Sequence, residues 1–144
     1  KNFLSKINPS TKTFQALRIF VNKEISELIN GITYATKFLR PGGRLIVISF
    51  HSIEDKIIKY YFSNFSKNRS NPSRYLPEDG ENKFFLFESY NKKVFKPSRN
   101  EIIKNKPSRS AKLRFAIRSK KGFSYPSNLF QKFEKYLNIE AKNV

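Results

Sequence analysis

The feature that most constrains the fold is a short, almost entirely apolar run from Leu45 to Phe50, which lies between two amphipathic stretches. Apolar residues recur in steps of three and four from Phe14 to Phe38, and this spacing predicts a helix that starts at Asn8-Pro9. Pro41 and the two glycines after it predict a turn that ends the helix. A β-branched apolar run is typical of a strand buried on both faces, as in a parallel sheet between helix layers.

A second helix is expected directly after this strand. Ser52 is the expected cap, and the helix is predicted over 53–65 with Glu54 and Asp55 in its first turn, where the helix dipole favours acidic groups. This placement explains the two carboxylates better than an acid–base pair does. Gly31 is the position where the first helix is expected to loosen or divide. A polar loop is expected from Ser63 onward, over 63–82.

The remainder of the chain alternates short strands and helices. Strands are predicted over 84–90 and 111–118, a short helix over 99–105 capped by Ser98, and an amphipathic helix over 127–138. Alternation in the later strand predicts that it is half buried, with an apolar face and a cationic face that carries Lys112, Arg114 and Arg118. The order is α/β. A single buried strand needs partners, which are expected from strands upstream of Lys1 or from another chain, and the absence of Met also suggests a processed or truncated chain.

The charge is strongly basic and unevenly placed. The formal net charge is +18, and the stretch 92–121 holds 12 basic residues with Glu101 as its single acid. Such a surplus favours a polyanionic partner. Within this stretch, the hydroxyl and basic side chains of Ser108 to Lys112 suit a phosphate, and a structural ion pair is the alternative. The aromatic residues over 84–95 are interpreted as core residues rather than as a base-stacking surface.

The only histidine, His51, follows the apolar strand. Ligands of open α/β sheets bind beyond the carboxyl ends of the strands, so His51 could contact a base, ribose or phosphate or move a proton. It could equally be a loop residue that closes the turn between strand and helix. Since the chain has no Cys and one His, no metal site is expected. No apolar run approaches the length of a membrane span and no signal-peptide pattern is present, which predicts a cytoplasmic protein without a membrane partner.

Three segments of the sequence resemble, in this order, the MraW-like family of S-adenosylmethionine-dependent methyltransferases, which modify cytosine N4 in bacterial 16S ribosomal RNA. They are NPSTKTFQALRIFVN at 8–22, LRPGGRLIVISFHSIEDKIIK at 39–59 and KPSRNEIIKNKPSRSAKLR at 96–114. Asn8 and Lys12 depart from the family pattern, which usually has His and Arg there. The resemblance implies the carboxyl-terminal portion of a class I (Rossmann-like) methyltransferase sheet with flanking helices and with its first strands missing.

The resemblance also implies where the chemistry lies. His51 and Ser52 are candidates to line the base pocket, and Arg109, Ser110, Lys112 and Arg114 are candidates for RNA contact or pocket structure. The family's cofactor motifs lie upstream of Lys1, so the whole enzyme would use S-adenosylmethionine, whereas this chain alone is expected to bind it weakly and to be inactive. The implied partner is ribosomal RNA in the small subunit. Residues 1–121 are assigned to the methyltransferase domain and 122–144 to a tail.

Two alternative functions remain open at this stage. A non-catalytic basic RNA-binding or ribosome-associated module would explain the charge without a cofactor. Part of a small-molecule methyltransferase would explain the segment LRPGGRLIVIS but not the basic stretch. Exposed sheet edges would also favour association into a homo-oligomer.

Overall fold

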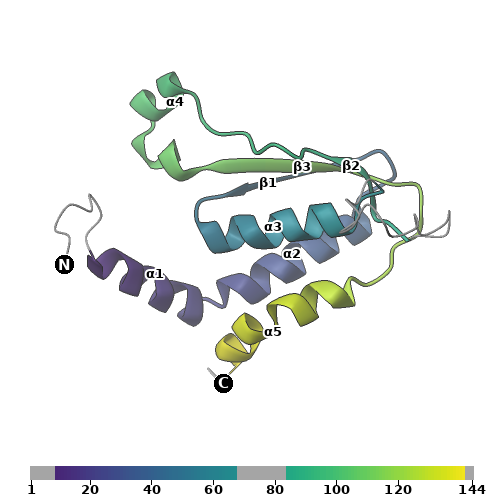
Figure 1. Ribbon diagram of the computed structural model, residues 1–144, viewed down its shortest axis with the longest axis horizontal. Helices are drawn as coiled ribbons and strands as arrows, with labels where there is room; N and C mark the ends of the chain where they lie inside the picture. Colours follow the sequence, from purple (N-terminus) through teal and green to yellow (C-terminus); the bar gives the residue numbers. More distant parts are fainter. Residues whose placement is uncertain (1–8, 68–83, 142–144) are drawn as a thin grey trace, which may run out of the picture.

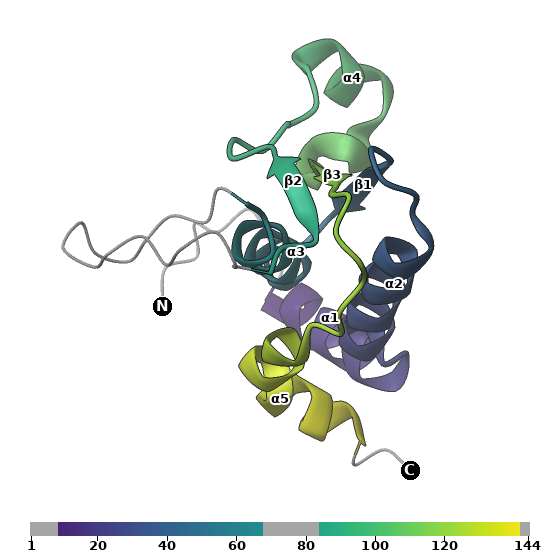
Figure 2. The same cartoon turned by 90° about the vertical axis from the view of Figure 1, so that its right-hand side faces the viewer.

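The computed structural model describes residues 9–67 and 84–141 (Figure 1). Three strands lie on one side of a double layer of helices, with α2 and α3 next to the sheet and α1 and α5 beneath them (Figure 2). The elements in chain order are α1 (Pro9–Val21), α2 (Glu24–Phe38), β1 (Arg44–Ser49), α3 (Ser52–Asn64), β2 (Phe87–Tyr90), α4 (Arg99–Lys104), the 3-10 helix η1 (Lys106–Ser110), β3 (Lys112–Arg118) and α5 (Ser127–Ala141). The predicted α/β class is confirmed.

The sheet is antiparallel, which corrects the parallel sheet predicted from the apolar run. Its strand order is β1-β3-β2, and β3 pairs antiparallel with both neighbours. The prediction that β1 is buried on both faces is also wrong, because Ile46 and Ile48 are 57% and 55% exposed. The helices α2 and α3 cover the opposite face, where Leu45 and Val47 pack against the core.

The cationic side of β3 points inward, which reverses the expected solvent-facing orientation. Arg114 and Arg118 are only 6% and 5% exposed, and Ala116 between them is fully buried. Buried guanidinium groups need partners. Arg118 donates through Nε to the Thr36 carbonyl at 3.2 Å and through Nη1 to the Leu86 carbonyl at 2.8 Å. These partners come from distant segments, so alternation alone could not reveal them.

The hydrophobic core joins the three helices α2, α3 and α5 to the inner face of the sheet. The predicted helix 53–65 is confirmed as α3, and its Tyr61 and Phe62 are fully buried, with rings that meet Phe87 of β2 at centroid distances of 5.4 and 5.3 Å. Leu129 and Phe133 bring α5 into the same core. The other buried members of this cluster are Ile25, Ile29, Ile32, Ile57, Ile58, Leu86 and Ala116.

The first predicted helix is divided at a different place from the one expected. It breaks at Asn22 and Lys23, where Lys23 has a left-handed backbone with φ 51°, whereas Gly31 lies inside α2. The chain changes direction at this break, so α1 does not continue the buried face of α2. Phe14 and Leu17, which belong to the same apolar run in the sequence, are therefore 70% and 53% exposed.

Local signals located most of the other elements. Gly42 has the positive φ of 78° expected in the turn before β1, and Ser98 caps α4 by accepting a hydrogen bond from the Glu101 amide. The predicted strand 84–90 is shorter, Phe87–Tyr90, and the last helix is longer, reaching Ala141. The proposed Asn8 cap and most of the loop 63–82 lie outside the described residues. Within the part of the chain that is described, no helix is long and apolar enough to span a membrane.

Candidate functional site

A pocket of about 650 Å³ opens at the carboxyl end of β1, the end predicted to bind ligands. Three segments that are far apart in the sequence line it: one face of α1 over 11–18, the turn from β1 to α3, and η1. The lining residues are Thr11, Phe14, Gln15, Arg18, Phe50, His51, Pro107, Arg109 and Ser110. Each segment belongs to a different one of the three motifs quoted above, so the fold brings those motifs together in one place.

His51 both lines this pocket and caps α3. Its Nδ1 accepts a hydrogen bond from the Glu54 amide at 3.5 Å, and the Glu54 carboxylate accepts from the His51 and Phe50 amides at 3.3 and 2.9 Å. These bonds form a capping box at the start of the helix. Ser52, the expected cap, is instead the first helical residue and is exposed. The two interpretations of His51, as a pocket residue and as the residue that closes the turn, are therefore compatible.

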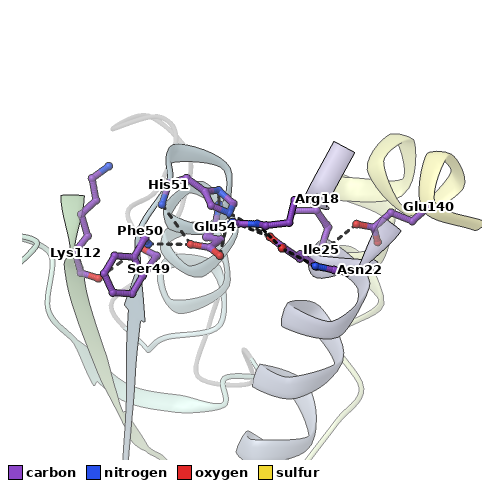
Figure 3. Close-up of polar contacts among 10 residues, drawn as sticks. Arg18, Asn22, Ile25, Ser49, Phe50, His51, Glu54, Lys112 and Glu140 are labelled. Carbon is purple, nitrogen blue, oxygen red and sulfur yellow. Dashed lines mark hydrogen bonds and ion pairs between the residues drawn. The ribbon is translucent and has the colours of Figure 1, made fainter. Parts of the chain in front are cut away.

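Two carboxylates flank the other nitrogen of His51 (Figure 3). Nε2 lies 3.0 Å from Glu54 Oε1 and 3.8 Å from Glu24 Oε2, and the imidazole side chain is only 9% exposed. Glu24 is held in turn by Arg18, whose Nε and Nη2 donate to its two oxygens at 2.7 and 3.2 Å. Contacts between charged and polar side chains therefore connect α1 to the start of α2 and the start of α2 to the start of α3.

The donor set of Glu24, His51 and Glu54 has the spacing of a possible metal site. The hydrogen bonds argue against this use. Because Nδ1 accepts the Glu54 amide, the proton of a neutral imidazole lies on Nε2, which leaves that nitrogen without a lone pair for a metal. The Arg18 guanidinium on Glu24 adds a further positive charge. The cluster is better described as a capping box that fixes the ring of His51 and places its Nε2 close to two carboxylates.

The four basic and hydroxyl candidates from the third motif separate into two pairs. Arg109 and Ser110 line the pocket, and both are exposed. Lys112 and Arg114 instead pair with Asp55 of α3, at 3.2 and 2.7 Å respectively. For these two residues the structure shows the ion pair that was the alternative to phosphate binding.

Asp55 is the acidic partner that accounts for the inward charges of β3. Burial alone would raise the pKa of its carboxyl group, but the hydrogen bonds and charges of Arg114 and Lys112 outweigh burial and lower this pKa. Asp55 therefore remains ionised well into the acidic range. These ion pairs link α3 to β3.

Sequence reasoning missed the contribution of α1. The apolar spacing places Phe14 on the face of a long helix and gives Arg18 no role, yet both line the pocket. Their orientation depends on the break at Lys23, which has no strong sequence signal. The one available signal was the first motif itself, which covers both residues.

The described residues offer no cradle for S-adenosylmethionine. The glycine pair Gly42-Gly43 lies at the amino end of β1, opposite the pocket, and a Cβ on Gly43 would lie 2.6 Å from Leu39 Cδ1. The absence of a side chain on Gly43 thus allows the turn to pack closely against Leu39. At the carboxyl end of β1, the free amides are already bonded by Glu54 and His51. No step of a reaction can be built on a bound cofactor from these residues.

Comparison with known proteins agrees with the three motifs. The model of the MraW methylase family matches residues 1–126. The chain is 46% identical to the ribosomal RNA small subunit methyltransferase H of Xanthobacter autotrophicus over 114 residues, which are 79% of this chain and 32% of that protein. It is 47% identical over 113 residues to the protein of that name from Afipia carboxidovorans, which are 78% of this chain and 33% of that protein. It is 45% identical over 112 residues to the one from Ehrlichia canis, which are 78% of this chain and 35% of that protein. The chain spans about a third of the length of these relatives.

Proposed function

The chain belongs to the MraW methylase family, and from this membership we propose that it is the carboxyl-terminal part of an S-adenosylmethionine-dependent methyltransferase that modifies cytosine N4 in small-subunit ribosomal RNA. The observation that carries the proposal is the pocket of about 650 Å³, which unites all three motifs at the carboxyl end of β1. Residues 1–121 are assigned to the methyltransferase domain, and the segment predicted as a tail from residue 122 contributes α5 to the same hydrophobic core.

The proposed fold is the last part of a class I sheet. In this assignment β1, β2 and β3 are its fifth, sixth and seventh strands. The antiparallel pairing of β2 with β3 supports the assignment. The earlier strands would lie beside the outer edge of β1, which has no strand partner among the described residues. A second copy of the chain could occupy the same edge, so association into a homo-oligomer remains part of the proposal.

The reaction sets clear requirements for the pocket. The lone pair of the exocyclic amine of cytosine is delocalised into the ring, so the base must be held out of its stack with this nitrogen oriented towards the methyl donor. S-adenosylmethionine supplies the methyl group from its sulfonium. The pocket is large enough for a nucleobase and has an aromatic side chain, Phe50, beside His51 and Arg109.

His51 acts in this proposal as a positioning residue rather than as the proton acceptor. Its Nδ1 is bonded to the Glu54 amide and its Nε2 faces two carboxylates, so neither nitrogen offers a free lone pair to the base. Its ring forms a fixed wall of the pocket, next to Ser52 at the start of α3. Arg109 and Ser110 supply hydrogen-bond donors on the opposite wall.

The chain alone is expected to be inactive and not to bind S-adenosylmethionine tightly. A chimera tests the proposal: residues 8–119 replace the corresponding segment of the Xanthobacter autotrophicus relative, and methylation of small-subunit ribosomal RNA is followed by mass spectrometry of the nucleosides. We expect N4-methylcytidine from the chimera and a strong loss on His51→Ala. Isothermal titration of the chain alone with S-adenosylmethionine should give no saturable heat.

A folded chimera that binds S-adenosylmethionine but leaves the RNA unmodified would overturn the proposal. It would favour the second candidate, a non-catalytic basic RNA-binding module, which the exposed cations of the α4 region support. The proposed location is the cytoplasm, where ribosomal RNA is available.

A further inference from the structure

The segment between β2 and β3 projects from the sheet as an arm. Its base is held to β3 by backbone hydrogen bonds, from the Asn91 amide to the Phe115 carbonyl at 3.0 Å and in both directions between Phe95 and Leu113 at 3.1 and 2.9 Å. Beyond Phe95 the chain forms α4 and η1 and returns to β3, away from the helix layers (Figure 1). We call residues 92–110 the basic arm.

The basic arm contributes little to the hydrophobic core. No residue of α4 is buried, and Ser108 is the one buried residue of η1. Between the arm and the outer face of the sheet lies a mostly apolar hollow of about 440 Å³, whose lining includes Ile48, Phe95 and Leu113. The arm is therefore a projection with solvent on most sides, which suits a surface for a partner better than a role in folding.

The cations of the arm are exposed and lack acidic partners among the described residues. Its single acid, Glu101, accepts a hydrogen bond from Asn105 at 3.4 Å instead of pairing with a cation. The seven exposed cations are Lys92, Lys93, Lys96, Arg99, Lys104, Lys106 and Arg109. Elsewhere the structure uses cations internally, as in the pairs of Lys112 and Arg114 with Asp55. The fold thus separates most of the cations of the basic stretch 92–121 into an inward structural set on β3 and an outward set on the arm, with Lys120 and Lys121 after β3 in neither set.

The arm ends at the pocket. Arg109 belongs both to the outward set and to the lining of the pocket that His51 also lines, and Ser110 beside it lines the same pocket. A polyanion that follows the cations of α4 towards η1 would therefore arrive where the base is to be held. This continuity between exposed charge and pocket is the main observation on which the inference rests.

We propose that the basic arm binds the phosphates of single-stranded RNA on one side of the target nucleotide and directs that nucleotide to the pocket. The inference rests on the proposed function for the identity of the nucleic acid as ribosomal RNA. Lysine and arginine side chains along such a path neutralise successive phosphates by displacing condensed counterions, without reading the sequence. The pocket would then select the target nucleotide, and the arm would supply affinity for the RNA backbone.

A charge-neutralised arm tests this proposal. The variant replaces Lys96, Arg99, Lys104 and Lys106 by Gln, and all four side chains are exposed without ion pairs among the described residues. The control replaces the same number of exposed lysines on the helix layers, Lys37, Lys59, Lys132 and Lys135, by Gln. Net charge changes equally in both proteins, so a general attraction to RNA would weaken equally.

Binding of a fluorescent single-stranded fragment of small-subunit ribosomal RNA is measured over a range of KCl concentrations. Each lost phosphate contact lowers the slope of log affinity against log salt by about 0.7, so the arm variant should lose roughly 3 in slope and at least about tenfold in affinity near 100 mM salt. The control should lose less than about threefold.

Equal losses in the two variants would overturn the arm proposal and leave the proposed function intact. No salt-dependent RNA binding by the unmodified chain would also overturn it, whereas the methylation assay of the chimera separately decides the enzyme assignment. Similar losses with a DNA strand of the same sequence would support the phosphate mechanism, because phosphate contacts do not distinguish the two sugars.

Discussion

Glu140 provides the most quantitative test of how α5 stabilises the site. Its carboxylate is 2% exposed and accepts from the Ile25 amide at 2.9 Å, from the Ser26 amide at 2.8 Å and from the Ser26 hydroxyl. The local cap position of α2, Lys23, is left-handed and makes no side-chain bond to the helix. Glu140 therefore caps α2 from the far end of the chain (Figure 3).

The size of the effect follows from these contacts. Glu140→Ala leaves two amides and a hydroxyl without their acceptor, and loss of a helix cap alone costs about 0.5–2 kcal/mol. An unsatisfied buried donor costs about 1–3 kcal/mol, and this cost overlaps with the cap term. We expect the free energy of unfolding to fall by about 2–4 kcal/mol. Glu140→Gln keeps one acceptor oxygen and should lose about half as much.

The assay is urea unfolding followed by far-ultraviolet circular dichroism. Glu134→Ala on the same helix is the matched control, because Glu134 is exposed, and its loss should stay within about 0.5 kcal/mol. The resonance of the only imidazole should also shift in Glu140→Ala, since the start of α2 carries Glu24, which faces His51. If Glu140→Ala loses no more stability than the control, water satisfies the α2 amides and the capping interpretation is wrong.

Two further predictions concern ionisation inside the fold. Because the folded-state pKa of Asp55 is lowered, its contribution to stability is complete above the ordinary carboxyl pKa and is lost as the pH falls through the lowered value. Asp55→Asn should therefore make the free energy of unfolding depend less on pH in the acidic range. Near neutral pH the substitution should cost about 3–5 kcal/mol, because it leaves Arg114 buried without a counterion. Burial raises the pKa of Tyr61 to about 12, so the contribution of its neutral hydroxyl to stability should be lost as the pH rises from about 10 towards that value. Tyr61→Phe should remove the step at the highest pH from the tyrosinate absorbance titration. A tyrosinate titration unchanged by Tyr61→Phe would contradict the second prediction.

Local sequence signals predicted the elements better than their orientation. The apolar run at β1, the glycine turn before it and the Ser98 cap each act within a few residues, so the chain alone reveals them. Alternation in β3 shows which residues share a face but not which face is buried. That choice depends on Asp55 and on the Thr36 and Leu86 carbonyls, which lie far away in the sequence.

The site could be predicted in part for the same reason. His51 follows the strand directly, and its place at the carboxyl end of β1 was predictable from the order of the elements. The roles of Phe14 and Arg18 were not predictable, because the direction of α1 depends on the left-handed backbone conformation of Lys23, which no sequence pattern indicates. Ser52 was chosen as the cap because serine is a common cap, whereas the imidazole of His51 fills that position.

The lack of internal partners for the cations of the basic arm has an evolutionary consequence. Within the described parts of the chain these side chains form no ion pairs, so replacing one of them removes no charge pair from the fold. Lys112, Arg114 and Arg118 are constrained, because each is anchored to partners in other segments. Selection on the arm should therefore act through binding rather than through stability, whereas the inward cations of β3 are constrained by folding itself, although both lie within the same basic stretch.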